Sequence, residues 1–398
     1  MISTRARAVS PSETLQISAK AKELQRQGRS VISLSAGEPD FKTPDHICRA
    51  AIEAIEAGFH GYTMNTGTPG LREAICDKLK RDNGLDYVPS QVVCTNGAKQ
   101  ALGFSLLALL DEGDEVIIPA PYWVSYPEMV RIAGGTPVTV RTDFGNSYRM
   151  RPSQLEKALT PRTKAVMLCS PSNPTGTCYS PAELAELAEV LEKRPGICVI
   201  SDEIYEYIRF DGQHTGILQV APGLYGRTVV INGFSKGFAM TGWRLGWLAA
   251  PQEIADAVAR IQSQETSAPS SISQKAGEAA YRGNLSAVHT MRDHFRDRRD
   301  YLFEALSSME GLKCFKPQGA FYLFPDISAY LGRRAPDGTE IADSTALCMY
   351  LLEAHGLAAV PGDAFGEPAG MRLSYAASME ELKEGVKRLK EGLSSLQP

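Results

Sequence analysis

The chain has 398 residues, of which 43% are hydrophobic and 22% are charged, and its formal net charge is -4. A chain of this length predicts one large and one smaller domain, and its charge lacks the basic footprint that nucleic-acid binding requires. No apolar run approaches the roughly 20 residues of a membrane helix.

The first 18 residues contain arginines but neither an apolar core nor a small-residue cleavage site. This composition favours a cytoplasmic protein over one carrying a targeting signal. Eight cysteines are scattered along the chain without a CxxC pair. We therefore expect buried thiols in a reducing compartment rather than disulfides or a metal site, and neither membrane nor nucleic-acid partners.

Short β-rich runs alternate with helical patterns between residues 90 and 250. The expected strands are 91–96, 115–121, 136–140, 165–171, 198–203, 228–234 and 244–250. Most are continuous apolar runs, typical of strands buried on both faces of a mainly parallel sheet. A helix is expected at 181–194, with Ser180 as N-cap and Pro181 at its first position. This alternation predicts an α/β large domain.

The pattern changes after residue 251. A long helical region runs from Gln252 to about Leu306, and Ser and Pro interrupt it at 267–271. Its part 291–302 interleaves Arg with Asp, which predicts a solvated helix face with local ion pairs. Shorter strand-like segments and a last helix then predict a smaller α+β domain: 311–317, 319–327, 356–365, 370–376 and the helix 379–393.

Three parts are expected along the chain. Residues 1–45 form an N-terminal segment that joins the small domain, residues 46–290 form the large domain, and residues 291–398 form the small C-terminal domain.

The segment INGFSKGFAMTGWRLG at 231–246 carries the strongest chemical signal. Lys236 follows an apolar strand, small residues come next, and Arg244 lies eight positions further on. A lysine that forms an imine must be neutral part of the time, which partial burial and nearby cations favour. An arginine can bind a phosphate in bidentate fashion. Taken alone, the segment fits a surface lysine equally well.

Asp202 and Glu203 end an expected strand 34 residues before Lys236, at the edge where open α/β sheets bind ligands. The pair could hold a metal, but no histidine or further carboxylate cluster accompanies it. A pyridinium nitrogen needs one carboxylate partner to stay protonated and act as an electron sink. Asp202 suits that role, and Tyr205 is available as a phenol donor.

Three further segments contain candidate ligand-binding groups. The turn SPSNPTG at 170–176 either simply leaves a strand or presents Asn173 to a ligand. Residues 95–110 predict a strand, a Gly turn and a helix whose first N–H groups can bind phosphate; the segment lacks the GxGxxG and GK[ST] patterns of dinucleotide and ATP sites. Arg372 is the only charge in an apolar strand, where a substrate carboxylate would pair it.

Nine segments, in order along nearly the whole chain, resemble the class I aminotransferases of fold type I, the aspartate aminotransferase family. They are SAGEPDFKTP, YTMNTGTPGLREAI, PAPYWVSYPEM, SPSNPTG, SDEIYE, NGFSKGFAMTGWRLG, PQGAFYLF, VPGDAF and MRLSYA. The resemblance implies an α/β fold with a mainly parallel seven-stranded sheet and a smaller α+β domain. It also implies pyridoxal 5'-phosphate as cofactor, amino acids and 2-oxo acids as substrates, and a homodimer with shared active sites.

The resemblance implies a role for each matching residue. Lys236 is similar to the catalytic lysine that binds the cofactor as a Schiff base, and Asp202 to the partner of the pyridine nitrogen. Further residues are implied to hold the cofactor. They are Asn173 and Tyr205 at the ring oxygen and Trp123 near the ring. At the phosphate they are Gly97, Ala98, Lys99, Ser235 and Arg244, and Tyr62 is implied to reach the phosphate of the neighbouring subunit. The residues implied to bind substrate are Gly37, Trp123, Asn173 and Arg372.

The implied reaction is transamination between L-aspartate and 2-oxoglutarate by a ping-pong mechanism, with Lys236 as general base. The NGAKQ and N-terminal segments resemble a bacterial and plastid subgroup in which some members also convert prephenate to arogenate. In those members a threonine and a lysine matter for prephenate, and they match Thr14 and Lys99; another branch has a lysine at the position of Ser10. Lys99 could instead only cap a helix or meet the phosphate.

Other activities stay open at this point: transamination of an aromatic or branched amino acid, or a lyase reaction on the same fold. A regulator without catalysis is disfavoured because no basic DNA-binding extension is present. Gly237 departs from the alanine or other small residue usual after the catalytic lysine, and we expect it to loosen the tether of Lys236 slightly.

Overall fold

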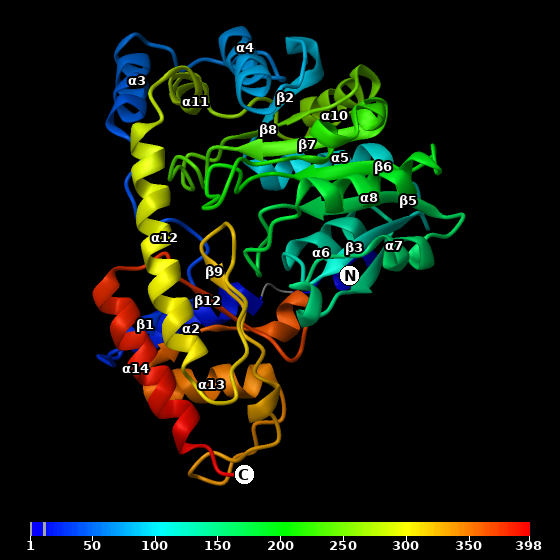
Figure 1. Cartoon of the computed structure of the whole chain (residues 1–398). Helices are drawn as coiled ribbons and strands as arrows, with labels where there is room; N and C mark the ends of the chain where they lie inside the picture. Colours follow the sequence, from blue (N-terminus) through cyan, green and yellow to red (C-terminus); the bar gives the residue numbers. More distant parts are fainter. Residues whose placement is uncertain (1, 11–12) are drawn as a thin grey trace.

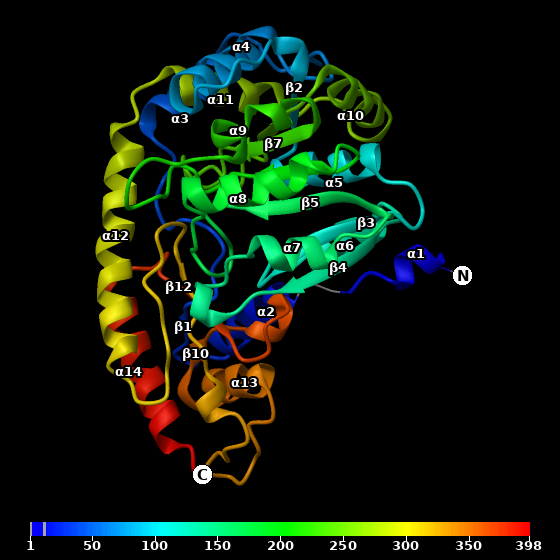
Figure 2. The ribbon, with the colours of Figure 1, turned by 45° about the vertical axis from the view of Figure 1, so that its right-hand side comes forward.

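The computed structural model describes residues 2–10 and 13–398, without the side chains of residues 4, 5, 13–16 and 18. A large layered part lies at the top of Figure 1 and a smaller part around α13 and α14 at the bottom. Helix α12 (Ser286–Ser307) runs along one side of both parts, as the rotated view in Figure 2 also shows. The predicted domain boundary at 290–291 falls inside this helix, and the three-part division stays a prediction.

The large part contains one seven-stranded sheet, which confirms the predicted architecture. Its strands, in spatial order, are β2 (Val92–Thr95), β8 (Gly246–Ala249), β7 (Thr228–Gly233), β6 (Cys198–Asp202), β5 (Thr163–Cys169), β3 (Glu115–Ala120) and β4 (Thr136–Arg141). Strand β8 is antiparallel to both of its neighbours, β2 and β7, and β7, β6, β5, β3 and β4 pair in parallel. The continuous apolar runs arise because most of these strands are buried on both faces.

Helices cover both faces of the sheet. One face packs against α5 (Ala98–Leu109), α6 (Ser125–Ile132) and α10 (Gln252–Glu265). The other packs against α3 (Asp45–Glu56), α4 (Pro69–Lys78), α7 (Pro152–Ala158), α8 (Pro181–Glu192), α9 (Ile217–Val220) and α11 (Ser271–Arg282). Helix α8 begins as predicted: Ser180 Oγ accepts from Glu183 N, and the Glu183 carboxylate accepts from Ser180 N.

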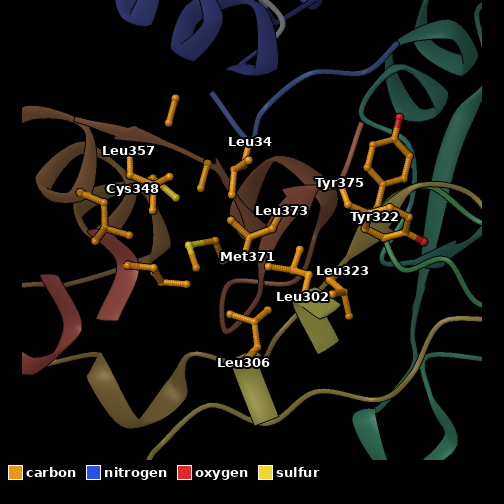
Figure 3. Close-up of a cluster of buried hydrophobic side chains, with 14 of the residues drawn as sticks. Leu34, Leu302, Leu306, Tyr322, Leu323, Cys348, Leu357, Met371, Leu373 and Tyr375 are labelled. Carbon is orange, nitrogen blue, oxygen red and sulfur yellow. The ribbon is translucent and has the colours of Figure 1, made fainter. Parts of the chain in front are cut away.

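The smaller part combines both ends of the chain. It contains α2 (Glu13–Arg26), β1 (Ile32–Ser33), β9 (Tyr322–Leu323), α13 (Ser344–His355), β10 (Leu357–Ala358), β11 (Val360–Pro361), β12 (Met371–Ser374) and α14 (Met379–Ser395), while the short α1 (Thr4–Arg7) contacts α6. Strand β1 pairs with β10, and β9, β12 and β11 form a second small sheet. Figure 3 shows the apolar core between these elements, where Leu302 and Leu306 of α12 meet Leu373.

One prediction in this region was wrong, and another was only partly confirmed. Segment 311–317 forms no strand, because among the described residues it finds no continuous partner: its one pairing is the bridge of Lys313 to Asp326. The Arg/Asp face of α12 is only partly solvated. Arg292 pairs locally with Asp293, but Arg299 is buried, donates to the carbonyl of Pro317 and stacks over Phe210.

Candidate active site

A cavity of about 320 Å³ lies at the carboxyl ends of β5, β6 and β7. Parallel strands collect their C-terminal residues at one edge, which is where open α/β sheets bind ligands. The sequence-predicted residues that line it are Gly37, Ala98, Lys99, Trp123, Asn173, Asp202, Tyr205, Ser235, Lys236, Arg244 and Arg372. The structure thus brings together residues that are up to 335 positions apart in the chain (Gly37 to Arg372).

Lys236 lies in the turn after β7, and its ammonium donates to the carbonyl of Gly37. The pKa of Lys236 is lowered to about 8, chiefly by burial; Arg372 and Arg244 also lower it, and Glu38 and Asp202 oppose them. A substantial fraction of this amine is therefore neutral near physiological pH, as imine formation and proton abstraction both require.

Asp202 ends β6 and is 3% exposed. Its carboxylate accepts from the hydroxyl of Tyr126 at 2.6 Å and from the backbone N–H of Ile204 at 3.2 Å. Burial raises the pKa of Asp202 to about 6, although both hydrogen bonds act to lower it. Asp202 forms no ion pair with another described residue, so this buried carboxylate is a strong acceptor for a protonated nitrogen.

The other end of the cavity is cationic and begins helix α5. Gly97, at φ 83°, precedes the helix, and a Cβ on it would lie 2.7 Å from Arg244 Nη2. Arg244 donates to the carbonyls of Thr241 and Asn96. Lys99 Nζ lies 5.2 Å from the ring centroid of Trp123, and burial together with Arg244 lowers the pKa of Lys99. Free helix N–H groups beside cations form a phosphate site.

Arg372, on β12, forms a third anchor and is 3% exposed. Its Nη1 donates to Asn173 Oδ1 and its Nη2 to the carbonyl of Ser35, both at 2.9 Å. Its Nε is a buried donor without an acceptor among the described residues. An unmatched donor of this kind is costly, and a bound carboxylate would satisfy it.

Tyr205 and Tyr322 share a hydrogen bond of 2.9 Å between their hydroxyls. Burial raises the pKa of Tyr205 well above its ordinary value, so its hydroxyl stays protonated and able to donate. The ring of Tyr322 also lies 4.5 Å from the guanidinium of Arg372. Tyr205 and Arg372 are therefore joined through a residue to which the sequence assigned no role.

Three predicted residues stand apart from the cavity lining. Gly97 lies behind it, against Arg244. The side chain of Tyr62 is fully exposed, at 104% of its reference area, and does not line the cavity. Thr14 lies in the first turn of α2, and its side chain falls outside the described residues.

Sequence reasoning missed Tyr126 and Tyr322, which both line the cavity. Each lies within a segment that carried the family resemblance, PAPYWVSYPEM and PQGAFYLF. The signal was present, but an aromatic residue in an apolar segment is more often part of a core.

The donor set fits pyridoxal 5'-phosphate. The cavity has a buried carboxylate for the ring nitrogen at one end, a helix start with two cations for the phosphate at the other, and a partly neutral lysine between them. Among residues 2–10 and 13–398, no group of three or more His, Cys, Asp or Glu is placed to hold a metal, and no helix is long and apolar enough to cross a membrane.

Comparisons with known proteins agree with this geometry. The model of the family "Aminotransferase class I and II" matches residues 29–389. An aspartate aminotransferase of Pinus pinaster is 48% identical over 403 residues, covering 100% of this chain and 82% of the relative. An aspartate/prephenate aminotransferase of Cereibacter sphaeroides is 49% identical and covers 96% of each chain. The crystal structure of the aspartate aminotransferase from Rhizobium meliloti has a TM-score of 0.97 at 44% identity, with 100% of both chains covered. The chain therefore belongs to the class I and II aminotransferases, a family that depends on pyridoxal phosphate.

Proposed function

We propose that this protein transfers the amino group between L-aspartate and 2-oxoglutarate, giving oxaloacetate and L-glutamate. One observation carries the proposal: a single cavity is lined by a lysine with a lowered pKa, by the buried carboxylate of Asp202 and by the guanidinium of Arg372, whose Nε has no acceptor among the described residues. The names of the relatives in Pinus pinaster and Cereibacter sphaeroides, both aspartate aminotransferases, support the choice of substrate.

The residues at the two ends of the cavity would hold the cofactor. The start of α5, Ser235 and Arg244 would bind its phosphate, and Asp202 would accept the proton-bearing ring nitrogen. The hydroxyl of Tyr205 would donate to the ring oxygen together with the amide of Asn173. When bound, pyridoxal phosphate supplies the electron sink that makes the Cα proton of an amino acid labile.

Arg372 would bind the α-carboxylate of the substrate. Its Nη1 and Nη2 are held by Asn173 and Ser35, which fixes the plane of the guanidinium, and its buried Nε has no acceptor among the described residues. Lys99, which lines the same cavity, offers a cation for a second carboxylate. A substrate with two carboxylates therefore suits this cavity better than an apolar amino acid.

Lys236 would move the proton. Its Nζ, when free and neutral, would accept the proton from the substrate Cα and could return it to a neighbouring carbon. A pKa of about 8 places this amine close to the operating pH, where general bases work best.

We also propose a homodimer in the cytoplasm. The complete exposure of Tyr62, with Met64 at 55%, is unusual for large apolar side chains and suits an interface. All eight cysteines are free, as expected in a reducing compartment. Analytical ultracentrifugation of the holoenzyme tests the dimer, and Tyr62→Phe tests the proposed phosphate contact through the affinity for the cofactor.

A panel of amino donors and keto acceptors tests the main proposal. We expect aspartate with 2-oxoglutarate to give the highest kcat/KM, and a Lys236→Ala protein to bind cofactor without the visible absorbance band and without turnover. Failure with aspartate and success with an aromatic or branched amino acid would refute the substrate assignment. Full activity of Lys236→Ala would refute the mechanism.

Prephenate is a second candidate substrate. A further hollow, bordered by Ala8, Val9 and Ser10, meets the cofactor cavity at Lys99 and offers room for a bulkier acceptor. The relative of Cereibacter sphaeroides is an aspartate/prephenate aminotransferase. We expect Lys99→Ala to reduce turnover of prephenate, and no turnover of prephenate by the parent protein would remove this activity.

A further inference from the structure

Gly237 directly follows Lys236 and lies against the side chain of Tyr207. A Cβ on Gly237 would lie 2.8 Å from Tyr207 Cδ2 and 3.0 Å from Tyr207 Cβ, which is closer than side chains pack. Gly237 has no positive φ that would itself call for glycine. The close approach of Tyr207 is therefore what requires glycine at this position. Gly237 packs tightly against Tyr207 and does not loosen the tether of Lys236, contrary to what the sequence suggested.

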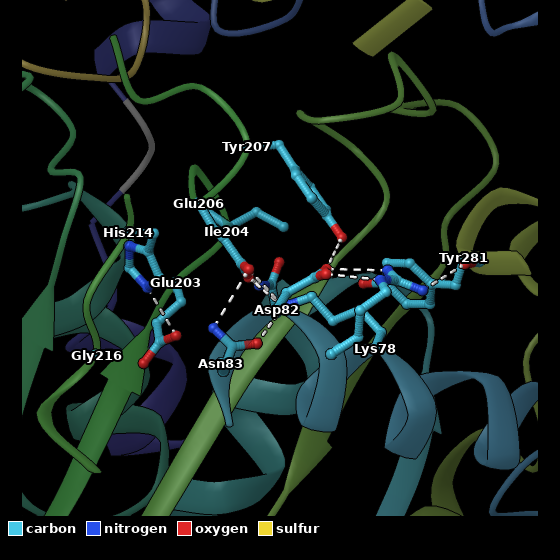
Figure 4. Close-up of polar contacts among 12 residues, drawn as sticks. Lys78, Asp82, Asn83, Glu203, Ile204, Glu206, Tyr207, His214, Gly216 and Tyr281 are labelled. Carbon is cyan, nitrogen blue, oxygen red and sulfur yellow. Dashed lines mark hydrogen bonds and ion pairs between the residues drawn. The ribbon is translucent and has the colours of Figure 1, made fainter. Parts of the chain in front are cut away.

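The ring of Tyr207 has little freedom to withdraw from Gly237. Its hydroxyl donates to Asp82 Oδ2 at 2.7 Å, and Asp82 in turn accepts from Arg81 Nε at 2.7 Å. The ring packs edge-on against Phe238 with 5.4 Å between centroids. Figure 4 shows the hydroxyl of Tyr207 directed at Asp82. Anchors at both the hydroxyl and the ring edge fix this side chain.

A buried ionic cluster holds both the segment before Tyr207 and the strand that leads to Lys236. Glu206, next to Tyr207, accepts from Lys78 Nζ at 2.6 Å, from Asn83 Nδ2 at 3.3 Å and from Asn232 Nδ2 at 2.6 Å. Lys78 is fully buried, and Figure 4 shows it beside Glu206 and Asn83. Asn232 belongs to β7, four residues before Lys236. The same cluster therefore holds the segment that carries Tyr207 and the strand end that leads to the lysine.

Asp82 and Asn83 both come from the short π-helical turn Leu79–Asn83, which continues α4. Such turns are rare and are often found at functional sites, because they displace side chains from their regular helical positions. Here the turn supplies one anchor to Tyr207 and one to Glu206.

We propose that Tyr207 is a positioning residue for Lys236: its anchored ring, seated against Gly237, sets where the backbone of the lysine lies and thus where its amine reaches in the cavity. This inference rests on the proposed function of Lys236. An amine displaced by part of an ångström loses its alignment with the reacting carbon, and a displacement of 1 Å can cost about 100-fold in rate.

Gly237→Ala tests the inference in the holoenzyme. The added methyl group meets the ring near its root, so the turn has to move rather than the ring. We expect kcat with aspartate to fall about tenfold and KM to stay near that of the parent, because Arg372 keeps its contacts. The pH midpoint of the visible absorbance band should shift by about half a unit or more, because the lysine nitrogen moves relative to Asp202, Glu38, Arg244 and Arg372.

The second variant is Gly237→Ala combined with Tyr207→Ala, compared with Tyr207→Ala alone. Removing the ring leaves room for the methyl group, so we expect Gly237→Ala to cost much less in this background. Gly226→Ala is the matched control, since a Cβ there meets no heavy atom within 4 Å and the residue precedes the opposite end of β7; it should behave as the parent.

Two results would overturn the inference: a parent-like kcat and band midpoint in Gly237→Ala, or an equal cost of Gly237→Ala with and without the ring. Should Gly237→Ala fail to fold, Tyr207→Phe and Asp82→Ala release the anchor without adding atoms, and a parent-like midpoint in both would overturn it as well. The midpoint is read without any amino acid, so a parent protein that binds cofactor but ignores aspartate would refute only the substrate proposal.

Discussion

Replacement of Asp202 by asparagine removes a charge from the cavity and almost no volume. Asp202 is 3% exposed, and among the described side chains the hydroxyl of Tyr126 donates to it. Two unit charges about 4 Å apart attract by about 4 kcal/mol at an effective dielectric constant of about 20, which equals roughly three pKa units. The pKa of the ring nitrogen would fall by that amount, and with it the ability of the cofactor to withdraw electrons. We therefore expect kcat/KM for aspartate to fall about 1,000-fold in Asp202→Asn.

The assay is the half-reaction with L-aspartate at pH 7, followed in a stopped-flow instrument through the visible band of the bound cofactor. Cofactor content, measured after release in alkali, must match that of the parent. Tyr126→Phe is the matched control: it removes one hydrogen bond to the same carboxylate and keeps the charge, so it should cost at most about 2 kcal/mol, roughly 30-fold. An Asp202→Asn protein that is fully loaded and no slower than Tyr126→Phe would refute the role of the charge.

Three further outcomes are expected. Arg372→Ala should reduce kcat/KM for aspartate roughly 100-fold, mainly through KM, because a paired carboxylate loses its guanidinium; steady-state kinetics measure it, and an unchanged KM contradicts it. Lys236 accepts a proton only when neutral and its pKa is about 8, so the single-turnover rate should rise with pH up to about 8 and level off above, whereas a flat profile contradicts the assignment. Lys78→Ala strands the buried charge of Glu206 and should lower the free energy of unfolding by about 3–5 kcal/mol, while Lys80→Ala, which removes an exposed pair, should cost less than about 1 kcal/mol in denaturant titrations.

The large domain could be predicted because buried strands appear in the sequence as continuous apolar runs. Strands such as β7 are covered on both faces and must be apolar throughout, so their limits agree with the sequence to within one or two residues. Segment 311–317 shows where this reasoning fails. It has the composition of a strand, but a strand also needs a continuous partner, and among the described residues this segment pairs only through the bridge of Lys313 to Asp326. The availability of a partner depends on tertiary packing that a local pattern does not record.

The site was predictable for a related reason. Asn173, Asp202 and Lys236 each follow a strand of one parallel sheet, so their meeting at one edge follows from topology. The hydroxyl network was not predictable: whether Tyr126 contacts Asp202, or Tyr322 contacts Tyr205, depends on side-chain directions at distances of 2.6 and 2.9 Å.

Gly237 shows how the meaning of a residue can reverse once its neighbours are known. As a sequence feature it suggested a looser tether for Lys236. The register of β6 and β7 pairs Asp202 with Ile231, and five residues beyond each of these lie Tyr207 and Lys236. The ring of Tyr207 thereby reaches the residue after the lysine, where only glycine leaves it room. The close contact at the backbone offsets the conformational freedom that glycine gives the chain. A larger residue at position 237 therefore requires a smaller one at position 207. The two positions should be mutated together when this turn is redesigned.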